Sequence, residues 1–507
     1  MSAIESSNKR IAKNTLYMYA RMGITMLVSL YTSRIVLGAL GDDDYGIYNV
    51  VASFIVAFTF ISNPLGTATQ RFISYELGKS NETERVGSVF NLSLKIYLLL
   101  VVLLVIVIEA VGIYFVNEKM QVPEGRLGVV QFVFQVSVAS LAINMLKTPF
   151  EAMVVAYEKM SFFAWLAIAE VLLMLLNAFS LVWLGGDRLK VYAVNRLIIS
   201  VVVFLLFCAF CFRSFEASKI RRVQDKGLFK QLLSFSGWSL FGAASSMAAD
   251  QGLNILLNLF YGVKVNAAYG ISHQVSAAVN QFVSNFQIAF RPQIVKTYAG
   301  DDVSRLHDLI YTTSKLSYLL LFAIVFPLVL NMDFVLAIWL KNVPAYTSFF
   351  CILILIYSLV ESLTAPLWMT VQATGNIKKY QITISCVMFL NVIFSYVALC
   401  CGAPPTSVLL IKVCLCFYYM VVRMLFVRKL TGLGLRLFAQ KVLLPVLVVS
   451  IIVGGATCLF AVNRSGASRF LVSLAVFLPT YCLLAYFVGL TKENRAAIRL
   501  MIKTKNR

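Results

Sequence analysis

Acidic, basic and amide side chains recur at helical spacing inside long apolar stretches of this chain. Around Asp250, small or polar residues repeat every four positions, at Gly242, Ser246, Asn254 and Asn258. This spacing places all five on one face of a helix. An unpaired polar group in hydrocarbon costs several kcal/mol, so such a face must contact protein or water. Hydrogen bonding, ion binding and proton transfer are the chemistry that these groups offer.

Two further stripes have helical spacing. After a predicted turn at Tyr261–Ala267, the next apolar stretch carries Asn280, Ser284, Gln287 and Arg291, three or four residues apart. The first apolar stretch of the chain carries Tyr17, Arg21, Thr25, Ser29 and Ser33, again four residues apart. We expect these stripes to line a water-filled cavity inside a bundle of membrane helices.

The ionisable groups within apolar stretches are functional candidates because burying them in a bilayer is costly. The guanidinium groups of Arg21, Arg34 and Arg291 can bind anions through paired hydrogen bonds. For Arg34 and Arg291, anchoring a helix end is the alternative. Asp250 is predicted to be an isolated carboxylate that binds a proton or Na⁺, and the alternative is a salt bridge between helices.

The composition requires a polytopic membrane protein. Of 507 residues, 60% are hydrophobic and 13% are charged, with a mean hydropathy of +0.82, far from the composition of a soluble domain. A membrane helix needs about 20 apolar residues, and fourteen stretches are long enough. Their approximate limits are 14–40, 45–66, 88–116, 127–147, 161–184, 191–212, 232–260, 266–290, 310–331, 347–369, 380–400, 407–427, 441–462 and 468–490.

The formal charge of +21 is explained by membrane topology. With the amino terminus inside, 28 of the 44 Lys and Arg residues fall on the inner side and 8 in the outer loops. This bias follows the positive-inside rule, places both termini in the cytoplasm and makes a nucleic-acid partner unnecessary. Two histidines and scattered cysteines predict no metal site. Lys95, Lys147, Lys315 and Arg423 are predicted to extend to water at the inner boundary, and Arg196 and Lys412 at the outer one.

An internal repeat divides the chain. Tyr45-Gly46-Ile47 returns as Tyr269-Gly270-Ile271, and the pair Pro149 and Ala156 returns as Pro366 and Ala373. Repeats six spans apart share one orientation in the membrane. We therefore predict a six-helix lobe at 1–212, a basic cytoplasmic linker at 213–231, a second six-helix lobe at 232–428, and two extra helices with a basic cytoplasmic tail at 429–507.

Five segments carry a family resemblance. They are Arg34-Ile35-Val36-Leu37-Gly38, Tyr45-Gly46-Ile47-Tyr48, the segment Thr69-Gln70-Arg71-Phe72-Ile73-Ser74-Tyr75-Glu76-Leu77-Gly78, then Arg291-Pro292-Gln293-Ile294-Val295-Lys296, and Gln372-Ala373-Thr374-Gly375. With the predicted helix count, the chain resembles the polysaccharide-transporter branch of the multidrug, oligosaccharidyl-lipid and polysaccharide exporter superfamily. The resemblance implies fourteen helices, with two pseudo-symmetric lobes around a cationic cleft, and a groove for a lipid tail at the last two.

The resemblance implies a flippase of the bacterial inner membrane, and not an enzyme. Its substrate would be an undecaprenyl-pyrophosphate-linked oligosaccharide for O-antigen or capsule. Alternating access of the two lobes would move it to the outer leaflet. We expect Arg21, Arg34, Thr25, Ser29, Asn254, Asn258, Gln281 and Arg291 to contact the head group, and Asp250 to couple transport to H⁺ or Na⁺. No cofactor or metal is expected. The expected partners of this monomer are membrane lipids and a glycan polymerase.

Two other functions compete with this hypothesis. An ion-coupled drug or metabolite antiporter of the same superfamily is the first, although such proteins often use an acidic residue where this chain has Arg21 and Arg34. A membrane glycosyltransferase is the second, with Asp42-Asp43-Asp44 as metal ligands in an outer loop. The acidic triplet also suits an ordinary solvated turn.

Overall fold

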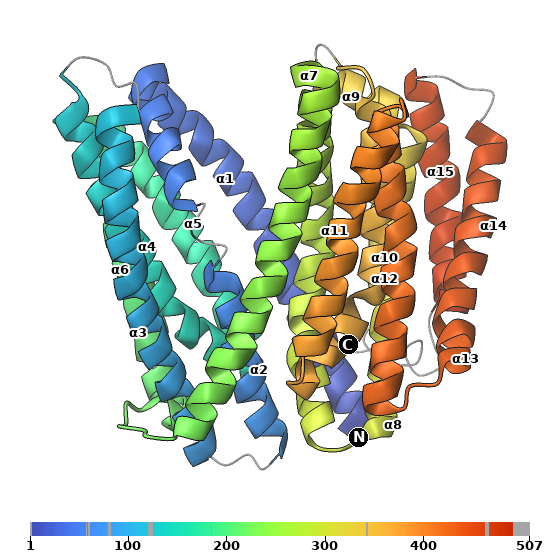
Figure 1. Ribbon diagram of the computed structural model, residues 1–507, viewed down its shortest axis with the longest axis horizontal. Coiled ribbons are helices and arrows are strands. Elements are labelled where there is room, and N and C mark those ends of the chain that lie inside the picture. Colours follow the sequence, from blue (N-terminus) through green and yellow to red (C-terminus); the bar gives the residue numbers. More distant parts are fainter. Residues whose placement is uncertain are drawn as a thin grey trace, which may run out of the picture. The chain divides into compact units, whose positions relative to one another are not determined.

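The computed structural model of the protein describes residues 3–56, 58, 61–79, 83–119, 125–183, 185–340, 343–461 and 466–489 (Figure 1). Every regular element in these ranges is helical, which confirms the predicted all-helical class. Eleven of the described helices are long and apolar enough to cross a membrane, and the protein is a multi-pass membrane protein. The count of fourteen spans stays a prediction, and the predicted basic tail at 490–507 lies outside the described residues.

The chain forms two compact units. The first unit, Asn14–Ala243, contains most of the first helix and the start of the seventh. Its helices are α1 (Ala3–Val56), α2 (Ser62–Lys79), α3 (Thr83–Tyr114), α4 (Leu127–Ala156), α5 (Met160–Trp183), α6 (Arg188–Ser214) and α7 (Lys226–Ala299). A π-helical turn, Phe115–Lys119, extends α3, and a 3-10 turn, Glu216–Ser218, follows α6.

The second unit takes up the start of α1, the rest of α7 and the helices after it. These are α8 (Val303–Leu330), α9 (Met332–Trp339), α10 (Thr347–Thr374), α11 (Lys378–Cys400), α12 (Thr406–Thr431), α13 (Leu435–Phe438), α14 (Leu444–Ala461) and α15 (Gly466–Leu484), with π-helical turns at Ala439–Leu443 and Ala485–Gly489. The boundary between the units falls inside α7, so the stretch at 213–231 that was predicted as a linker belongs to the first unit. The predicted four-part division of the chain itself stays a prediction.

One side chain holds this linker against α3. The Asn91 amide donates to the backbone carbonyl of Lys219 at 3.1 Å and accepts from the backbone N–H of Arg221 at 3.0 Å. Gly87 allows the close approach, because a Cβ there would lie 3.1 Å from the carbonyl oxygen of Ala217. The linker is therefore a packed part of the first unit.

Each of the two long helices contains one glycine break. Gly41 in α1 has φ 77° and ψ 175°, and Gly262 in α7 has φ 74° and ψ −171°. Only glycine adopts this conformation readily. The near-identical geometry supports the internal repeat, as do the positive φ angles of Glu158 and Gly375, which follow the repeated Pro–Ala pairs.

Two predicted boundaries are wrong. The turn predicted at Tyr261–Ala267 is reduced to the break at Gly262, since helical hydrogen bonding continues on both sides. The span predicted at 45–66 is not one helix, because α1 ends at Val56 and a new helix begins at Ser62. Apolar residues continue across that gap, so hydropathy alone does not reveal it.

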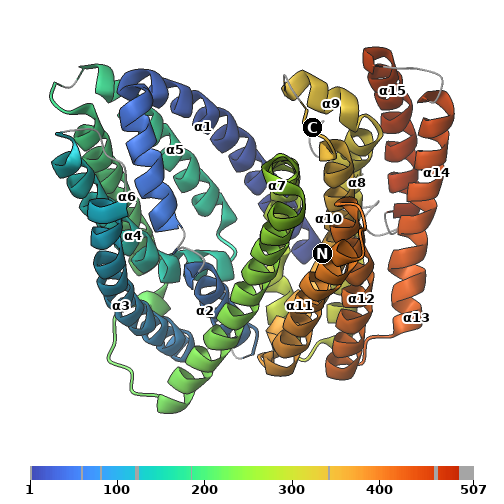
Figure 2. The ribbon, with the colours of Figure 1, turned by 45° about the horizontal axis from the view of Figure 1, so that its top comes forward.

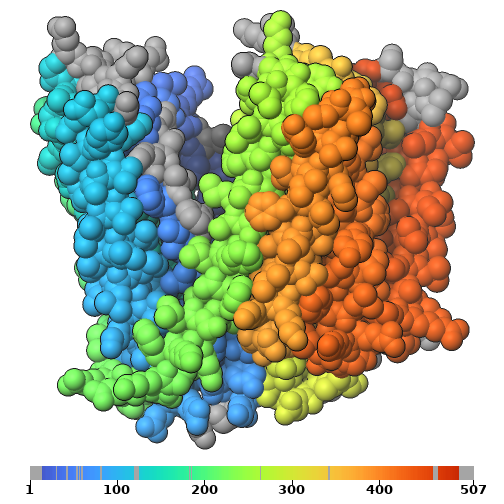
Figure 3. Space-filling model, viewed as in Figure 1, coloured from blue at the N-terminus to red at the C-terminus, as the bar shows by residue number. Residues whose placement is uncertain are grey.

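Packing in the second unit places α10 at its centre. Among the candidate membrane helices, α10 has the largest buried share, and it packs against α8 and α12. In turn α11 packs against α12, and both helices present side chains on the face drawn in Figure 3. The final helices α14 and α15 pair with each other beside α8 (Figure 2). Polar contacts fix this pair, including Asn331 Nδ2 to Ser473 Oγ at 2.9 Å and Tyr481 Oη to the Leu319 carbonyl at 2.7 Å.

The outward faces of the helices are apolar. On α3, the residues Leu98, Leu99, Val102, Leu103 and Ile106 are each more than half exposed. In water such a band would be an aggregation hazard, whereas lipid chains solvate it at no cost. The polar residues that chemistry needs must therefore be sought on the other faces.

Candidate functional site

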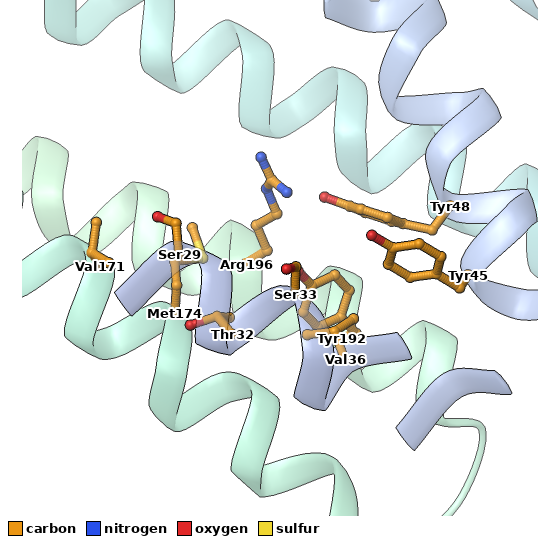
Figure 4. Close-up of a pocket in the computed structure, with 10 residues that line it drawn as sticks. All are labelled: Ser29, Thr32, Ser33, Val36, Tyr45, Tyr48, Val171, Met174, Tyr192 and Arg196. Atoms are coloured by element: carbon orange, nitrogen blue, oxygen red, sulfur yellow. The ribbon is translucent and has the colours of Figure 1, made fainter. Parts of the chain in front are cut away.

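A cavity of roughly 260 Å³ lies within the first unit (Figure 4). The break at Gly41 lets both halves of α1 contribute to it, and α5 and α6 complete the wall. The lining residues are Ser29, Thr32, Ser33, Val36, Tyr45, Tyr48, Val171, Met174, Tyr192 and Arg196. Six of these ten carry hydroxyl groups, one is a cation and none is acidic. The arrangement can hydrogen-bond a polyhydroxylated ligand and favours a negative charge.

Arg196 is the charged group of this cavity. Its guanidinium carbon lies 5.6 Å from the centre of the Tyr48 ring, and the two side chains point toward one another (Figure 4). The Tyr48 ring contacts Tyr192 edge-on, with centroids 5.0 Å apart. Contact with an aromatic ring that is itself packed restrains the orientation of the guanidinium, while its N–H groups remain available to a ligand.

Four charged side chains meet elsewhere in the first unit. Lys147 Nζ on α4 lies 3.2 Å from Glu151 and 3.9 Å from Glu170 on α5. Arg21 on α1 interacts electrostatically with Glu151, and its guanidinium carbon lies 5.1 Å from the Phe163 ring centre. The cluster is formally neutral, which lowers the free-energy cost of burying these four charges in a membrane. The prediction that Lys147 extends to water is wrong, because it is buried between two carboxylates.

Asp250 is paired, which corrects the prediction of an isolated carboxylate. Lys412 Nζ on α12 donates to Asp250 Oδ1 at 2.8 Å. The side chain of Lys412 is 10% exposed and that of Asp250 is 42% exposed, so the carboxylate keeps access to solvent or a ligand. Lys412 Nζ also lies 4.9 Å from the Tyr357 ring centre. The Asp250 carboxylate can exchange its partner, whereas the ammonium group of Lys412 has little access to anything else.

A second ion pair in the same unit is more deeply buried. Arg423 Nη1 on α12 lies 2.8 Å from Glu361 Oε2 and 2.6 Å from Thr364 Oγ1 on α10. Arg423 Nε donates to the Tyr380 hydroxyl on α11 at 3.1 Å. The prediction that Arg423 reaches water is therefore wrong, and this arginine instead ties three helices together.

The other predicted contact residues are dispersed. Ser29 lines the cavity, while Thr25 donates to the Met22 carbonyl on its own helix at 3.1 Å. Arg34, Asn258 and Gln281 are exposed, and none of them lines this cavity. Asn254 Nδ2 lies 3.5 Å from Gln251 Oε1, and the Arg291 guanidinium carbon lies 5.5 Å from the Trp368 ring centre. Of the predicted residues, the structure brings only Ser29 to the cavity.

Several lining residues had only a weak signal in the sequence. Arg196 stood out as a charge within a predicted span, but its position near one end suggested a contact with water. Tyr48 belongs to the Tyr45-Gly46-Ile47-Tyr48 segment, which marked the family and not a ligand site. Nothing in the periodicity of α5 or α6 singled out Met174 or Tyr192, because their role depends on the packing of three helices.

Of the alternative metal site at Asp42-Asp43-Asp44, the structure describes only the side chain of Asp44. The carboxylate of Asp44 binds Arg126, which also binds Asp187 at the start of α6. The side chains of Asp42 and Asp43 lie outside the described residues. Among the side chains that the structure does describe, no group of three or more His, Cys, Asp and Glu residues could hold a metal ion. The ion pair with Arg126 therefore gives the Asp44 carboxylate a role in helix packing.

Comparison with solved structures defines the class of fold. The chain resembles a mutant MATE transporter with a TM-score of 0.72 at 15% identity, covering 84% of this chain and 97% of that one. It also resembles an outward-facing multidrug resistance MATE family transporter of the MOP superfamily, with a TM-score of 0.69, 16% identity and coverage of 84% and 96%. At these identities the likeness establishes the fold, which is that of MATE transporters.

The sequence identifies the family within that fold. The profile of the family described as "Polysaccharide biosynthesis protein" matches residues 11–298. The chain belongs to this family, which confirms the resemblance that its motifs indicated. A comparison with curated proteins found no match.

Proposed function

We propose that this protein is a flippase for an undecaprenyl-pyrophosphate-linked oligosaccharide in the bacterial inner membrane, serving O-antigen or capsule export. One observation supports this most strongly: a hydroxyl-lined, cation-bearing cavity lies within membrane helices of a chain from a polysaccharide biosynthesis family. Such a cavity suits sugars better than it suits an apolar or cationic drug. The MATE-like fold supplies a transporter framework for it.

The cost of moving the head group explains why a protein is needed. A pyrophosphate carrying several sugars cannot cross hydrocarbon unaided, since each charge and hydroxyl would lose its hydrogen bonds to water. Polar helix faces replace those bonds during passage, and arginine can pair with phosphate oxygens. We assign head-group contact to Arg21, Arg34 and Arg291 with the Asn254 face, and the lipid tail remains in the bilayer.

The proposed mechanism is alternating access of two six-helix lobes, in a protein of fourteen spans with both termini in the cytoplasm. Asp250 is the proposed coupling residue. In the structure Lys412 neutralises it, so a proton or Na⁺ arriving at Asp250 would compete with Lys412. Breaking that pair would loosen α7 from α12, and this gives ion binding a structural consequence.

Reconstituted vesicles test the proposal directly. A fluorescent lipid-linked oligosaccharide in the inner leaflet should become accessible from outside only when the protein is present. Arg21→Ala and Asp250→Asn should each slow this step at least tenfold while the protein still inserts. Lys190→Gln, at the start of α6, serves as the matched control. No acceleration over empty vesicles by the wild-type protein would refute the function, and normal rates in both variants would refute only the residue assignments.

An ion-coupled antiporter is the second candidate, and the MATE fold is the observation that favours it. The electrostatics of the first-unit cavity oppose it, because Arg196 repels a cationic substrate and no lining residue is acidic. Uptake of a cationic dye into vesicles along an H⁺ or Na⁺ gradient distinguishes the two. Dye transport without oligosaccharide flipping would select the antiporter.

A further inference from the structure

The first-unit cavity has the size of a site for one sugar ring. Its volume of roughly 260 Å³ is slightly below the ~300–1,000 Å³ typical of pockets for drug-sized ligands. The pocket is partly open, so the remainder of an oligosaccharide would lie outside it. A single pyranose ring, which is smaller than a typical drug, matches this space.

The walls suit the two kinds of surface that a sugar presents. The hydroxyl groups of Ser29, Ser33 and Tyr45 border the space and can exchange hydrogen bonds with ring hydroxyls. The apolar C–H face of a pyranose can pack on the tyrosine rings, of which Tyr48 and Tyr192 brace each other edge-on. Tyrosine supplies contact area at a low cost in side-chain entropy, and serine supplies adaptable hydrogen bonds.

The charge of the cavity narrows the class of sugar. Arg196 is its one charged lining residue, and no hydrogen bond or ion pair joins Arg196 to another side chain in the described part of the protein. A single guanidinium matches a single carboxylate, through two parallel hydrogen bonds. A pyrophosphate would bring two or more negative charges into a space with one cation, leaving part of its charge uncompensated and poorly solvated.

We propose that this cavity is a recognition subsite for one carboxylate-bearing sugar residue, of the hexuronic acid class, within the transported oligosaccharide. Arg196 binds the carboxylate, and the hydroxyl groups of α1 with the tyrosine rings bind the sugar ring. This inference rests on the proposed flippase function and deepens it by naming a feature of the substrate. The subsite would select glycans that contain an acidic residue.

Binding to the full chain in lipid nanodiscs tests the subsite. Isothermal titration calorimetry would compare methyl glucuronoside, methyl glucoside and inorganic pyrophosphate as probes. We expect the glucuronoside to bind at least tenfold more tightly than the glucoside. Arg196→Gln should abolish that preference, whereas Arg213→Gln, at the opposite end of α6, should leave it unchanged.

The outcomes separate this inference from the function on which it rests. Equal binding of glucuronoside and glucoside by the wild-type protein, or tighter binding of pyrophosphate, overturns the subsite without relying on any variant. The subsite is also overturned if Arg196→Gln still prefers glucuronoside to glucoside. Its elution and helicity must show that this variant folds. Flipping of a neutral oligosaccharide lipid in the absence of glucuronoside binding would leave the flippase standing and remove the subsite. Glucuronoside binding without flipping would leave a site for an acidic sugar and would refute the flippase function.

Discussion

Arg126 joins helices α1 and α6 through two ion pairs, and the loss of these ion pairs has a predictable effect on stability. Arg126, at the start of α4, binds Asp44, which follows the Gly41 break, and also Asp187, which caps α6. Hydrogen bonding to the Asp44 carboxylate raises the pKa of Arg126 above its ordinary value. A raised folded-state pKa means that the stabilisation is complete below the ordinary arginine pKa and is lost only as the pH rises through the folded value. At neutral pH the contact is therefore intact.

The effect of Arg126→Gln follows from the geometry. A hydrogen bond to a charged group contributes about 1.5–3 kcal/mol, and partial exposure lowers each ion pair to about 1 kcal/mol. Losing both ion pairs would lower the free energy of local opening by about 2 kcal/mol. The population of the open state would therefore rise about 30-fold. Hydrogen–deuterium exchange of the backbone amides that follow Gly41 measures this population. We expect those amides to exchange about 30-fold faster, with exchange in α10 unchanged.

Asp187→Asn provides the graded control for the same contact. Asparagine caps a helix as well as aspartate does, so the capping bonds to the backbone N–H groups of Leu189 and Lys190 are retained and one ion pair is lost. We expect the free energy of local opening to fall by about 1 kcal/mol and the backbone amides after Gly41 to exchange about fivefold faster. Exchange within twofold of the wild type in Arg126→Gln would refute the reasoning, since the helix break would then hold its position without the ion pairs.

Two further predictions concern the second unit, and both use the free energy of unfolding in nanodiscs. Gly262→Ala should lower it by about 2 kcal/mol because φ 74° with ψ −171° is costly for any residue with a Cβ. Gly270→Ala, at an open helical position, should be neutral or slightly stabilising, and equal effects would refute the argument. Arg423→Met should cost about 3 kcal/mol by leaving Glu361 unpaired. Adding Glu361→Gln should recover most of that loss, and no recovery would show that packing and not charge dominates.

Class, family and approximate helix limits could be predicted from the sequence because they depend on local properties. An apolar run of about 20 residues is enough to specify a membrane helix, whatever the helix packs against. The spans predicted at 127–147 and 407–427 correspond to α4 and α12 in this way. The break between α1 and α2 was missed for the same reason, since hydropathy averages over a short gap.

The candidate site depended on residues that are far apart in the chain. Asp250 and Lys412 are 162 positions apart, and Lys147 meets Glu170 on another helix. Periodicity shows that a residue lies on a polar face, but it does not show what lies opposite that face. Prediction therefore allowed a salt bridge for Asp250 without identifying Lys412 as its partner, and it treated Arg196 as a residue near water.

The sequence by itself determined that the chain crosses the membrane many times, that it repeats internally and that it belongs to a polysaccharide biosynthesis family. Only the tertiary structure decided which charges are neutralised and that α1, α5 and α6 together line a pocket that contains Arg196. The physical reason is the range of the forces involved. Transfer into lipid is a sum over neighbouring residues, whereas ion pairs and cavities depend on angstrom-scale distances between helices that the chain order does not fix.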